Sequence, residues 1–324
     1  MVYMTTSEKL QIIMQLSGQT QEALAKRLDV SFVSFNRWIN GRAQPHQKAL
    51  NRIEALYRQL TGQKQWPDSA LLAKKSIIRQ KSVKIKNIVT LINTRPDLRD
   101  EFALSLTYNT NRIEGSTVTR DETAAILFDR AVLRRRTLTE QLEVKNHQSA
   151  WLYLLNYLQD RQPISEALIL KMHAILMNSV HEEAGQYRRH GVRIVGANVP
   201  TANHLSIVRL MGQLVPDMNK KRSDTVSLMA DIHARFEQIH PFADANGRVG
   251  RLLLQAMLMK RNFPPAIIKQ QDRRQYMKSL KRAQVTDDMT LLEDFLSDAI
   301  LSGFALLESP HPPVPTLIYK KSTL

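Results

Sequence analysis

The stretch from His240 to Arg251 brings four chemically active side chains together within twelve residues. His240 can accept a proton near neutral pH. Asp244 can hold Mg²⁺, which prefers hard oxygen ligands. Arg248 and Arg251 are three positions apart, so both can fork onto phosphate oxygens or a carboxylate from one face of a helix. These residue types at this spacing predict a site that handles a nucleotide phosphate.

Backbone groups add to this site. Ala245, Asn246 and Gly247 form a turn small enough to aim N–H groups at an anion. The apolar run that follows from position 252 predicts a helix whose positive end faces the same anion. A solvated turn between two helices is the plain alternative. A zinc site is disfavoured, because His233 and His240 lie seven apart, with no His-Glu-x-x-His pattern and no cysteine.

These twelve residues resemble the signature of Fic domains, His-x-Phe-x-(Asp/Glu)-(Gly/Ala)-Asn-(Gly/Lys)-Arg-x-x-Arg, with every defined position filled. The segment from His233 to Ile239 is similar to the helix that leads into that motif. Fic enzymes mostly move AMP from ATP to a protein Ser, Thr or Tyr hydroxyl and release pyrophosphate. The resemblance therefore implies a protein adenylyltransferase with ATP as substrate and Mg²⁺ as cofactor. Ala245 stands where many members carry Gly, and it narrows the backbone choices of the turn.

The resemblance also assigns roles to single residues. His240 is the general base, Asp244 the metal ligand, and Asn246 and Arg248 complete the catalytic set. The nucleotide-binding positions that it implies are Ala245, Asn246, Gly247, Arg248, Val249, Gly250 and Arg251. On a later helix, Tyr276 and Gln284 fall in the region where the family builds its adenine pocket.

A second segment, Thr110-Asn-Arg-Ile-Glu-Gly115, resembles the inhibitory motif of the same family, (Ser/Thr)-x-x-x-Glu-(Gly/Asn). In the family this glutamate pairs with the second arginine of the signature, which here makes a pair of Glu114 and Arg251. An arginine serves one anion at a time, so a paired Arg251 cannot hold the γ-phosphate. The resemblance thus implies self-inhibition. Taken alone, the segment is also compatible with Gly115 as an ordinary helix C-cap.

A third segment interrupts the helical periodicity between these two motifs. The residues from Gly185 to Arg188, and then from Val192 to Pro200, predict a short β-hairpin. It resembles the Fic flap, which lies over the active site and pairs with the target segment as an added strand. An ordinary surface hairpin is the alternative.

The N-terminal part carries a different pattern. From Thr20 to Arg42 the chain predicts two short helices joined by a tight turn, with Thr20 and Ser31 as N-caps. Two buried stripes are expected. The first consists of Leu24, Ala25 and Leu28. The second consists of Val30, one of Val33 and Phe35, and Trp38. The segment resembles a helix-turn-helix of the Cro and phage-repressor type over residues 5–58. Asp29 replaces the common turn glycine, which is tolerable because Asp visits the left-handed region readily.

By the docking geometry of that motif, the helix from Ser31 to Ile39 enters the major groove of duplex DNA. The expected base-reading positions are Phe32, Val33, Asn36 and Arg37, and the positions near phosphates are Gln21, Asn40 and Arg42. A module kept for protein interaction or dimerisation is the alternative, because Phe32 and Val33 place apolar side chains at the groove-facing end.

The charge balance suits a polyanionic partner. The chain has 46 Lys and Arg against 30 Asp and Glu, a net charge of +16. Residues 71–90 carry six basic residues and no acidic one, so this segment can run along a DNA backbone or form a solvated helix face. No apolar run reaches membrane-spanning length and the first residues lack a signal-peptide pattern. We therefore expect a cytoplasmic protein without a membrane partner.

The expected fold is mainly α: a Fic-like helical domain with a small β-hairpin flap, preceded by a small all-α helix-turn-helix domain. We expect the helix-turn-helix at 1–62, a basic helical linker at 63–95, the Fic domain at 96–308 and a Pro-rich tail at 309–324. Within the Fic domain the inhibitory segment lies near 107–116, the flap near 185–204 and the catalytic motif at 240–251.

Two classes of function remain open. The first is a self-inhibited AMP transferase that modifies a protein hydroxyl, its own included, and carries a DNA-binding appendage. The second is a transcriptional regulator whose Fic unit senses nucleotide without turnover. An enzyme that removes AMP, or transfers another nucleotide, is a variant of the first. The intact His240 favours an enzyme, because a pure sensor needs no base. The target, the operator sequence and the oligomeric state, a homo-oligomer included, stay open.

Overall fold

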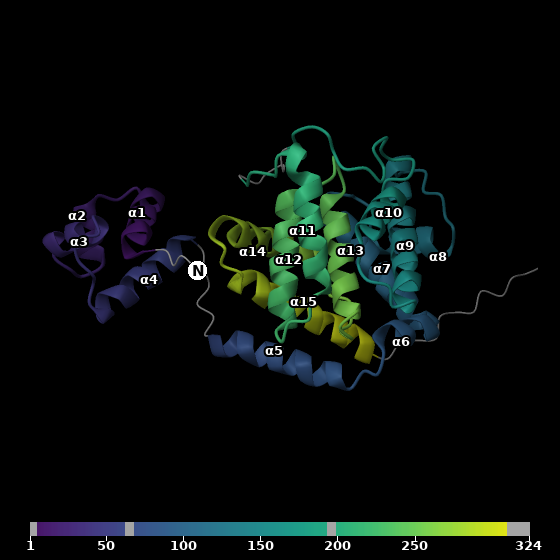
Figure 1. The fold of residues 1–324 in the computed structure, drawn as a ribbon, viewed down its shortest axis with the longest axis horizontal. Helices are drawn as coiled ribbons and strands as arrows, with labels where there is room; N and C mark the ends of the chain where they lie inside the picture. Colours follow the sequence, from purple (N-terminus) through teal and green to yellow (C-terminus); the bar gives the residue numbers. More distant parts are fainter. Residues whose placement is uncertain (1–4, 62–67, 193–198, 310–324) are drawn as a thin grey trace, which may run out of the picture. The chain divides into compact units, whose positions relative to one another are not determined.

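The computed structural model describes residues 5–61, 68–192 and 199–309 (Figure 1). The chain divides into two compact units, with the boundary after Ala70. The described residues are almost all in helices or their connections and contain no β-strand. The mainly α fold is therefore confirmed. The centre of the predicted hairpin, residues 193–198, lies outside the described residues.

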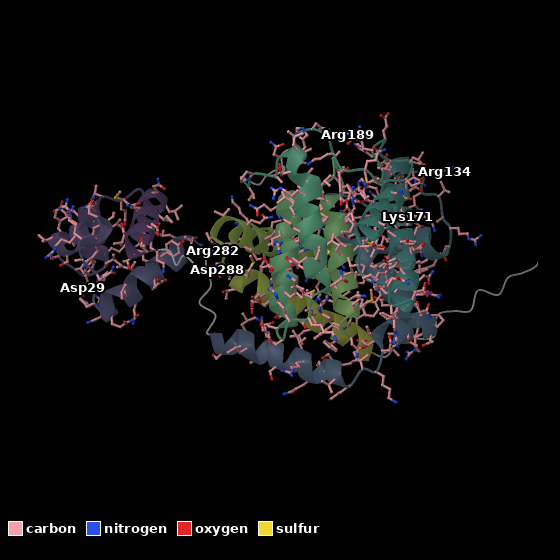
Figure 2. All side chains as sticks on the ribbon, viewed as in Figure 1. Asp29, Arg134, Lys171, Arg189, Arg282 and Asp288 are labelled. Carbon is pink, nitrogen blue, oxygen red and sulfur yellow. The ribbon has the colours of Figure 1, made fainter. Side chains whose placement is uncertain are left out.

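The described residues 5–61 of the first unit form the helices α1 (Thr6–Ser17), α2 (Gln21–Arg27), α3 (Phe32–Ile39) and α4 (Gln47–Thr61). Hydroxyl side chains cap the N-termini of two of these helices. The Thr20 hydroxyl accepts the Ala23 N–H at the start of α2, and the Ser31 hydroxyl accepts the Ser34 N–H at the start of α3. Asp29, in the turn between them, has φ +57° (labelled in Figure 2). Its carboxylate accepts a 2.7 Å hydrogen bond from Arg52 of α4, which ties the turn to the rest of the unit.

This unit has its own hydrophobic core. Leu24, Ala25 and Leu28 of the first predicted stripe are buried in it. In the second stripe Phe35 and Trp38 are buried and Val30 is partly buried, whereas Val33 is 66% exposed on the outer side of α3. The aromatic ring thus fills the core and leaves an aliphatic side chain in water.

The second unit is a larger helical assembly. Its elements are α5 (Asp68–Val83), α6 (Ile88–Thr94), α7 (Pro96–Ile113), α8 (Arg120–Phe128), α9 (Leu138–Gln159), α10 (Glu166–Leu176), a short 3₁₀ turn (His204–Ser206), α11 (Ile207–Asn219), α12 (Thr225–Ile239), α13 (Asn246–Met259), a second 3₁₀ turn (Gln270–Asp272), α14 (Arg273–Thr286) and α15 (Thr290–Glu308). No helix among the described residues is long and apolar enough to cross a membrane.

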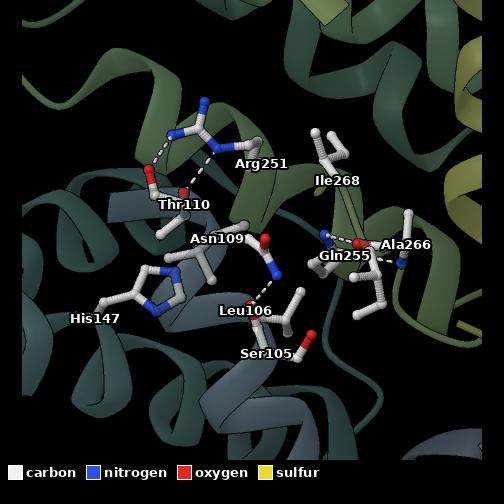
Figure 3. A pocket seen from close by; sticks show the side chains of 11 residues that line it. Ser105, Leu106, Asn109, Thr110, His147, Arg251, Gln255, Ala266 and Ile268 are labelled. Atoms are coloured by element: carbon white, nitrogen blue, oxygen red, sulfur yellow. Dashed lines mark hydrogen bonds between the residues drawn. The ribbon is translucent and has the colours of Figure 1, made fainter. Parts of the chain in front are cut away.

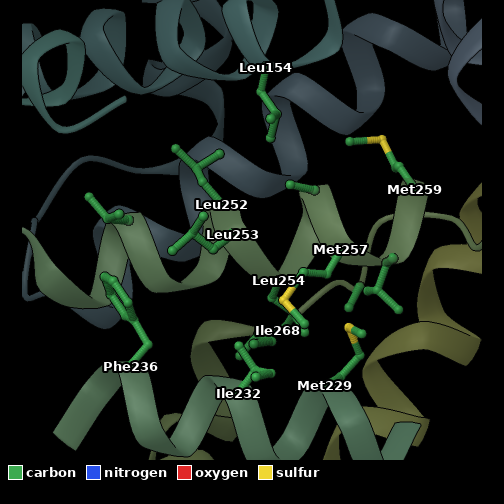
Figure 4. Close-up of a cluster of buried hydrophobic side chains, with 14 of the residues drawn as sticks. Leu154, Met229, Ile232, Phe236, Leu252, Leu253, Leu254, Met257, Met259 and Ile268 are labelled. Atoms are coloured by element: carbon green, nitrogen blue, oxygen red, sulfur yellow. The ribbon is translucent and has the colours of Figure 1, made fainter. Parts of the chain in front are cut away.

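Helix α13 runs through the middle of this unit. It is buried along nearly its whole length, as expected for a helix that is apolar on all sides after its first turn. On one side its leucines and methionines face Phe236, Ile232 and Met229 of α12, and on the other side α9 contributes Leu154 (Figure 4). A six-residue turn joins α12 to α13, so the Fic-like signature lies at one end of the most buried helix pair.

Within the second unit, charged side chains of helix α5 form ion pairs with neighbouring elements. Lys74 donates to Asp294 at 2.7 Å and Lys81 to Glu308 at 2.7 Å, both on α15. Lys75 pairs with Asp224 and Glu293. The basic run at 71–90 is thus partly neutralised by acidic residues far away in the sequence.

Candidate active site

His240 ends α12 in a left-handed conformation, with φ 52° and ψ 61°. Its imidazole Nδ1 lies 3.1 Å from the Glu237 carbonyl oxygen. Because a carbonyl only accepts, Nδ1 carries the proton and the lone pair is left on Nε2. Burial lowers the pKa of His240, which favours the neutral ring. The half-buried imidazole is therefore available as a base.

Asn246 holds the turn after His240 in shape. Its amide accepts from the Phe242 N–H and donates to the Phe242 carbonyl, both at 2.8 Å. The Phe242 ring is buried and stacks on His173 at 3.8 Å. The Asn246 side chain is thus occupied by the backbone, so it shapes the turn and has no free group aimed at a ligand.

Helix α13 begins without a side-chain cap. Its N-cap residue, Ala245, has φ 60° and no polar side chain. The first N–H groups of a helix have no intrahelical partner, so they can bind an anion together with the positive end of the helix dipole. The predicted phosphate-binding positions at the start of α13 are therefore structurally competent. Val249 and Gly250 point into the protein, where Val249 is fully buried and Gly250 packs on Phe236 and Glu237.

Asp244 and Arg248 lie next to each other beside this helix start. The Asp244 carboxylate is 57% exposed and lies 3.6 Å from the Arg248 guanidinium. Arg248 is buried and donates a 2.6 Å hydrogen bond to Glu143 of α9. Sequence reasoning did not single out Glu143, which lies 105 residues from its partner. Asp244 is thus open to solvent, while the ion pair with Glu143 fixes the position of Arg248.

Arg251, one turn further along α13, is held by the end of α7. Its Nε donates to the Thr110 hydroxyl at 2.7 Å, and a terminal nitrogen contacts the Thr110 carbonyl at 3.4 Å (Figure 3). The same terminal nitrogen donates to the Glu114 carboxylate at 2.5 Å. The structure therefore brings the predicted pair of Glu114 and Arg251 into contact.

Gly247 makes room for Glu114. A Cβ atom at position 247 would collide with the Glu114 carboxylate and lie 2.9 Å from the Arg251 guanidinium. Glu114 is the C-cap of α7, and Gly115 follows with φ 103°. The Glu114 side chain is 36% exposed, whereas Arg251 is buried. The carboxylate thus lies against the open start of α13 on a side chain that solvent can reach.

A small cavity of about 20 Å³ lies beside Arg251, between α7, α9 and α13. That volume holds about one water molecule, so it cannot take an adenine ring. The cavity's neighbours include His147, Thr110 and Gln255 (Figure 3). The base of a nucleotide would therefore need a place other than this cavity.

The two residues predicted for an adenine pocket are bonded to α12. The buried Tyr276 hydroxyl lies 2.7 Å from His233 Nε2, and the Gln284 amide donates to the Ala234 carbonyl at 3.3 Å. Glu237, on the same face as His233, is buried with one carboxylate oxygen unpartnered, and burial raises its pKa to about 7. No motif or spacing in the sequence singled out Glu237.

Asp244 is the only acidic side chain of the signature. No group of three or more His, Cys, Asp or Glu side chains that could hold a metal was found within the described ranges. Mg²⁺ is commonly bound through one or two carboxylates together with substrate phosphates. An exposed carboxylate beside an uncapped helix start fits that kind of site, with the nucleotide supplying the remaining ligands.

In the first unit the predicted DNA-contacting residues lie on α3 and just after it, except Gln21, which is the first residue of α2. Phe32 is 48% exposed and Val33 is exposed beside it. The Asn36 amide donates to Gln21 of α2 at 3.0 Å, which fixes these two side chains together. The remaining positions are also solvent-exposed, namely Arg37, Asn40 and Arg42.

Comparison with known proteins supports a Fic domain in the second unit. Residues 163–258 match the Fic/DOC family. A protein named protein adenylyltransferase Fic from Drosophila ananassae is 31% identical over 220 residues, which cover 65% of this chain and 44% of that protein. The protein of the same name from Drosophila melanogaster is 33% identical over 184 residues, 56% of this chain and 37% of that protein. The chain thus spans less than half the length of these relatives.

Two solved structures share the fold. A fragment of Fic-1 from C. elegans superimposes with a TM-score of 0.66 at 22% identity, covering 92% of this chain and 86% of that one. A Fic domain containing signaling protein from Bacteroides thetaiotaomicron gives 0.64 at 22% identity, covering 72% of this chain and 95% of that one. At this identity the likeness speaks for the architecture alone.

Proposed function

We propose that this Fic-domain protein is a protein adenylyltransferase, which transfers AMP from ATP to a hydroxyl group of a protein. One observation carries the proposal: His240 has a free Nε2 lone pair at the turn that leads directly into the uncapped start of α13. A base and an anion site are thus built by adjacent residues. The relatives that bear the name adenylyltransferase support the same reaction.

The transfer needs a proton acceptor and a place for the phosphates. The Nε2 atom of His240 accepts the proton of the target hydroxyl, while the oxygen of that hydroxyl attacks the α-phosphorus of ATP. The bond from the α-phosphorus to the bridging oxygen breaks, and pyrophosphate leaves with its electrons. The N–H groups at the start of α13 and the guanidinium of Arg248 stabilise the charge on the phosphate oxygens. Asn246 keeps the turn in shape for both tasks.

Asp244 is the residue that would hold Mg²⁺ in this site. The cation would neutralise charge on the phosphate oxygens during the transfer. Arg248 lies close enough to Asp244 to orient the carboxylate from behind.

The contact between Glu114 and Arg251 supports self-inhibition as part of this function. Arg251 lies one turn into α13, where its guanidinium can reach a γ-phosphate only when Glu114 does not occupy it. Glu114 also covers the space over Gly247, at the start of the same helix. One carboxylate therefore blocks both the arginine and part of the anion site. Because its side chain is partly exposed, it can turn into solvent without unfolding α7.

For the first unit we infer a DNA-binding role. The exposed outer side of α3 carries Phe32, Val33 and Arg37, a combination suited to thymine methyl groups and guanine edges. A protein-interaction module remains the competing reading, since two of these three side chains are apolar.

The test is incorporation of label from α-labelled ATP with Mg²⁺ into purified protein and into cell-extract proteins. We expect weak labelling by the wild type and strong labelling by Glu114→Gly. Adding His240→Ala to that variant should abolish the labelling while ATP still binds. Glu101→Ala is a matched control, because Glu101 lies on the same helix and also pairs with an arginine, Arg120, away from the signature.

The competing functions predict other results. A nucleotide sensor would bind ATP in every variant without incorporating label. An enzyme that removes AMP would release label from a pre-modified target, and His240→Ala would stop that release. Residual transfer by the His240→Ala variant within a few-fold of its parent would exclude His240 as the base.

A further inference from the structure

We propose that Arg188 is a positioning residue for His240. Its hydrogen bonds fix the backbone at residues 239–241 and also hold His190 and Ala202, which lie before and after residues 193–198. This inference rests on the proposed role of His240 as the base. Arg188 lies outside the signature, at the end of the first part of the segment that resembles the flap, and that resemblance gives its side chain no role.

The Arg188 guanidinium is buried, with only 2% of the residue exposed. Its Nε donates to the His240 carbonyl at 2.7 Å, and a terminal nitrogen reaches the Ile239 carbonyl at 3.3 Å. These are the last carbonyls of α12, which have no partner within the helix. The Arg188 backbone N–H also donates to the Pro241 carbonyl at 3.0 Å. Three consecutive carbonyls around His240 therefore receive hydrogen bonds from one residue.

The other side of the guanidinium holds the segment that follows it. One terminal nitrogen donates to the His190 carbonyl at 2.7 Å, and the other to the Ala202 carbonyl at 2.7 Å. The Ala202 N–H in turn donates to the Gln238 carbonyl at 3.2 Å. The chain just before and just after residues 193–198 is thus tied to the same turn as His240.

The Arg188 guanidinium donates to four main-chain carbonyls, so the arrangement depends on the shape of the guanidinium. Its planar fork points five N–H donors in fixed directions, which a lysine ammonium cannot reproduce. The fork matters here because His240 is a non-glycine residue with positive φ, a conformation that persists only where its surroundings enforce it. Arg188 supplies that enforcement through its hydrogen bonds to the carbonyls of Ile239, His240 and Pro241.

The consequence is a specific effect on catalysis. A misplacement of a reacting group by about 1 Å can cost roughly 10²-fold in rate. Substituting Arg188→Lys keeps the positive charge but removes the fork, so kcat should fall by about 10-fold to 100-fold. The KM for ATP should stay within about three-fold, because the anion site at the start of α13 receives no bond from Arg188.

Arg261 offers a matched control. It also donates only to main-chain carbonyls, those of Met257, Met218 and Lys220, at 2.7 to 2.9 Å. It follows the other end of α13 and touches nothing in the signature. Arg261→Lys removes an equivalent set of bonds and should leave kcat unchanged.

The experiment measures the ring of His240 directly as well as the rate. The protein has nine histidines, and the ring signals of His240 in ¹⁵N-histidine spectra can be assigned by their loss in His240→Gln. We expect Arg188→Lys, and not Arg261→Lys, to shift these signals and to lower kcat in the Glu114→Gly background. Unchanged His240 signals with unchanged kcat would overturn the proposal, and so would equal effects of both substitutions.

Two further measurements keep the outcomes separate. If Arg188→Lys does not fold, Arg188→Ala with added ethylguanidinium should restore the His240 signals, and failure of this rescue in a folded variant counts against the proposal. If no variant transfers AMP, the proposed function fails, but the spectra still decide whether Arg188 positions His240.

Discussion

Glu143 of α9 and Arg248 of α13 form an ion pair of 2.6 Å in which the guanidinium is almost completely buried. The pair joins the first half of α9 to the start of α13. It leaves the other side of Arg248 facing Asp244, the predicted metal ligand. A residue outside every recognisable motif therefore fixes one that lies inside the signature.

Glu143→Ala should destabilise the second unit, because it leaves the buried Arg248 guanidinium with only the exposed Asp244 carboxylate, 3.6 Å away, as a counter-charge. Removing one partner of a buried pair costs about 3–5 kcal/mol, and the partial exposure of Glu143 reduces the expected loss to about 2 kcal/mol. Urea unfolding measures the change. Glu143→Gln, which can still accept the hydrogen bond, should lose less than half as much, and equal losses would show that the hydrogen bond contributes nothing.

Glu114→Gly and Arg251→Ala should behave differently, although both break the same ion pair. Only the first leaves an arginine for the γ-phosphate, so Glu114→Gly should raise incorporation of α-labelled AMP about tenfold or more, in line with an oriented phosphate contact. Arg251→Ala should stay at or below the wild-type level. Similar activities in the two variants would mean that the pair serves only the fold.

Two additions sharpen this comparison. Asp244→Ala in the Glu114→Gly background should remove the gain, because Asp244 is the proposed Mg²⁺ ligand. Gly247→Ala should reproduce part of the gain, since the new methyl group would displace the Glu114 carboxylate. Increased inhibition in Gly247→Ala would contradict the fit described for these residues.

Ala245→Gly should stabilise the protein by about 1 kcal/mol. Ala245 has φ 60°, a conformation that costs a residue with a Cβ about 1–2 kcal/mol and that glycine adopts freely. The gain in glycine flexibility in the unfolded state offsets part of this. Thermal unfolding should show a higher Tm with unchanged nucleotide affinity. A lower Tm would indicate that the Ala245 methyl, which is buried, matters more for packing than for strain.

Stability should fall as the pH drops below about 6.5, because three buried histidines are neutral in the folded protein, and the raised pKa of Glu237, which acts in the opposite direction, offsets only one of them. Burial lowers the pKa of His173 to about 4. Burial, with the charge of Arg251 as the next cause, lowers the pKa of His147 and His233 to about 3. Between the unfolded and folded pKa values the unfolded chain binds more protons, so each histidine contributes up to about 1.4 kcal/mol of lost stability per pH unit.

Urea unfolding at pH 7, 6 and 5 measures this slope. His147→Gln should make it shallower, since the glutamine does not titrate, while the exposed His181→Gln should leave it unchanged. An equal slope in wild type and His147→Gln would show that the pKa of His147 is the same in the folded and unfolded states, which contradicts the prediction.

Residues 1–70 should fold alone and bind duplex DNA with a steep dependence on salt. This unit has a separate hydrophobic core, and phosphate contacts lower the logarithm of affinity by about 0.9 per contact for each tenfold rise in salt. Fluorescence anisotropy decides it. Arg42→Ala should reduce the slope by about 1 without changing sequence preference. Absence of binding at low salt would favour the protein-interaction reading of Phe32 and Val33.

The sequence predicted the mainly helical fold and the cluster around His240 better than it predicted what surrounds them. The signature fixes residue types within twelve positions, and short spacing along a turn and a helix determines where such side chains lie. The same holds for the helix starts at Thr20 and Ser31, whose caps act on N–H groups three residues ahead.

Long-range partners left no such trace. Glu143 was one acidic residue among several on a long helix, and only the packing of α9 against α13 makes it the partner of Arg248. Arg188 bonds to main-chain carbonyls, which every residue type possesses, so no pattern of side chains could reveal its acceptors. The choice between Val33 and Phe35 likewise depended on which side of α3 faces the core.

Arg251 bonds both Thr110 and Glu114 at the end of α7, and this determines how fast the proposed blocked and open forms would exchange. Because Thr110 also bonds the guanidinium, we expect the proposed blocked and open forms to differ by a rotation of the Glu114 side chain and not by a movement of helices. Rotations of partly exposed side chains take picoseconds to nanoseconds, far less than a typical turnover at about 1–10³ per second. Each catalytic cycle would then sample both forms many times. The rate of the wild type would equal the intrinsic rate multiplied by the open fraction, so the gain on removing Glu114 measures how rarely the site is open.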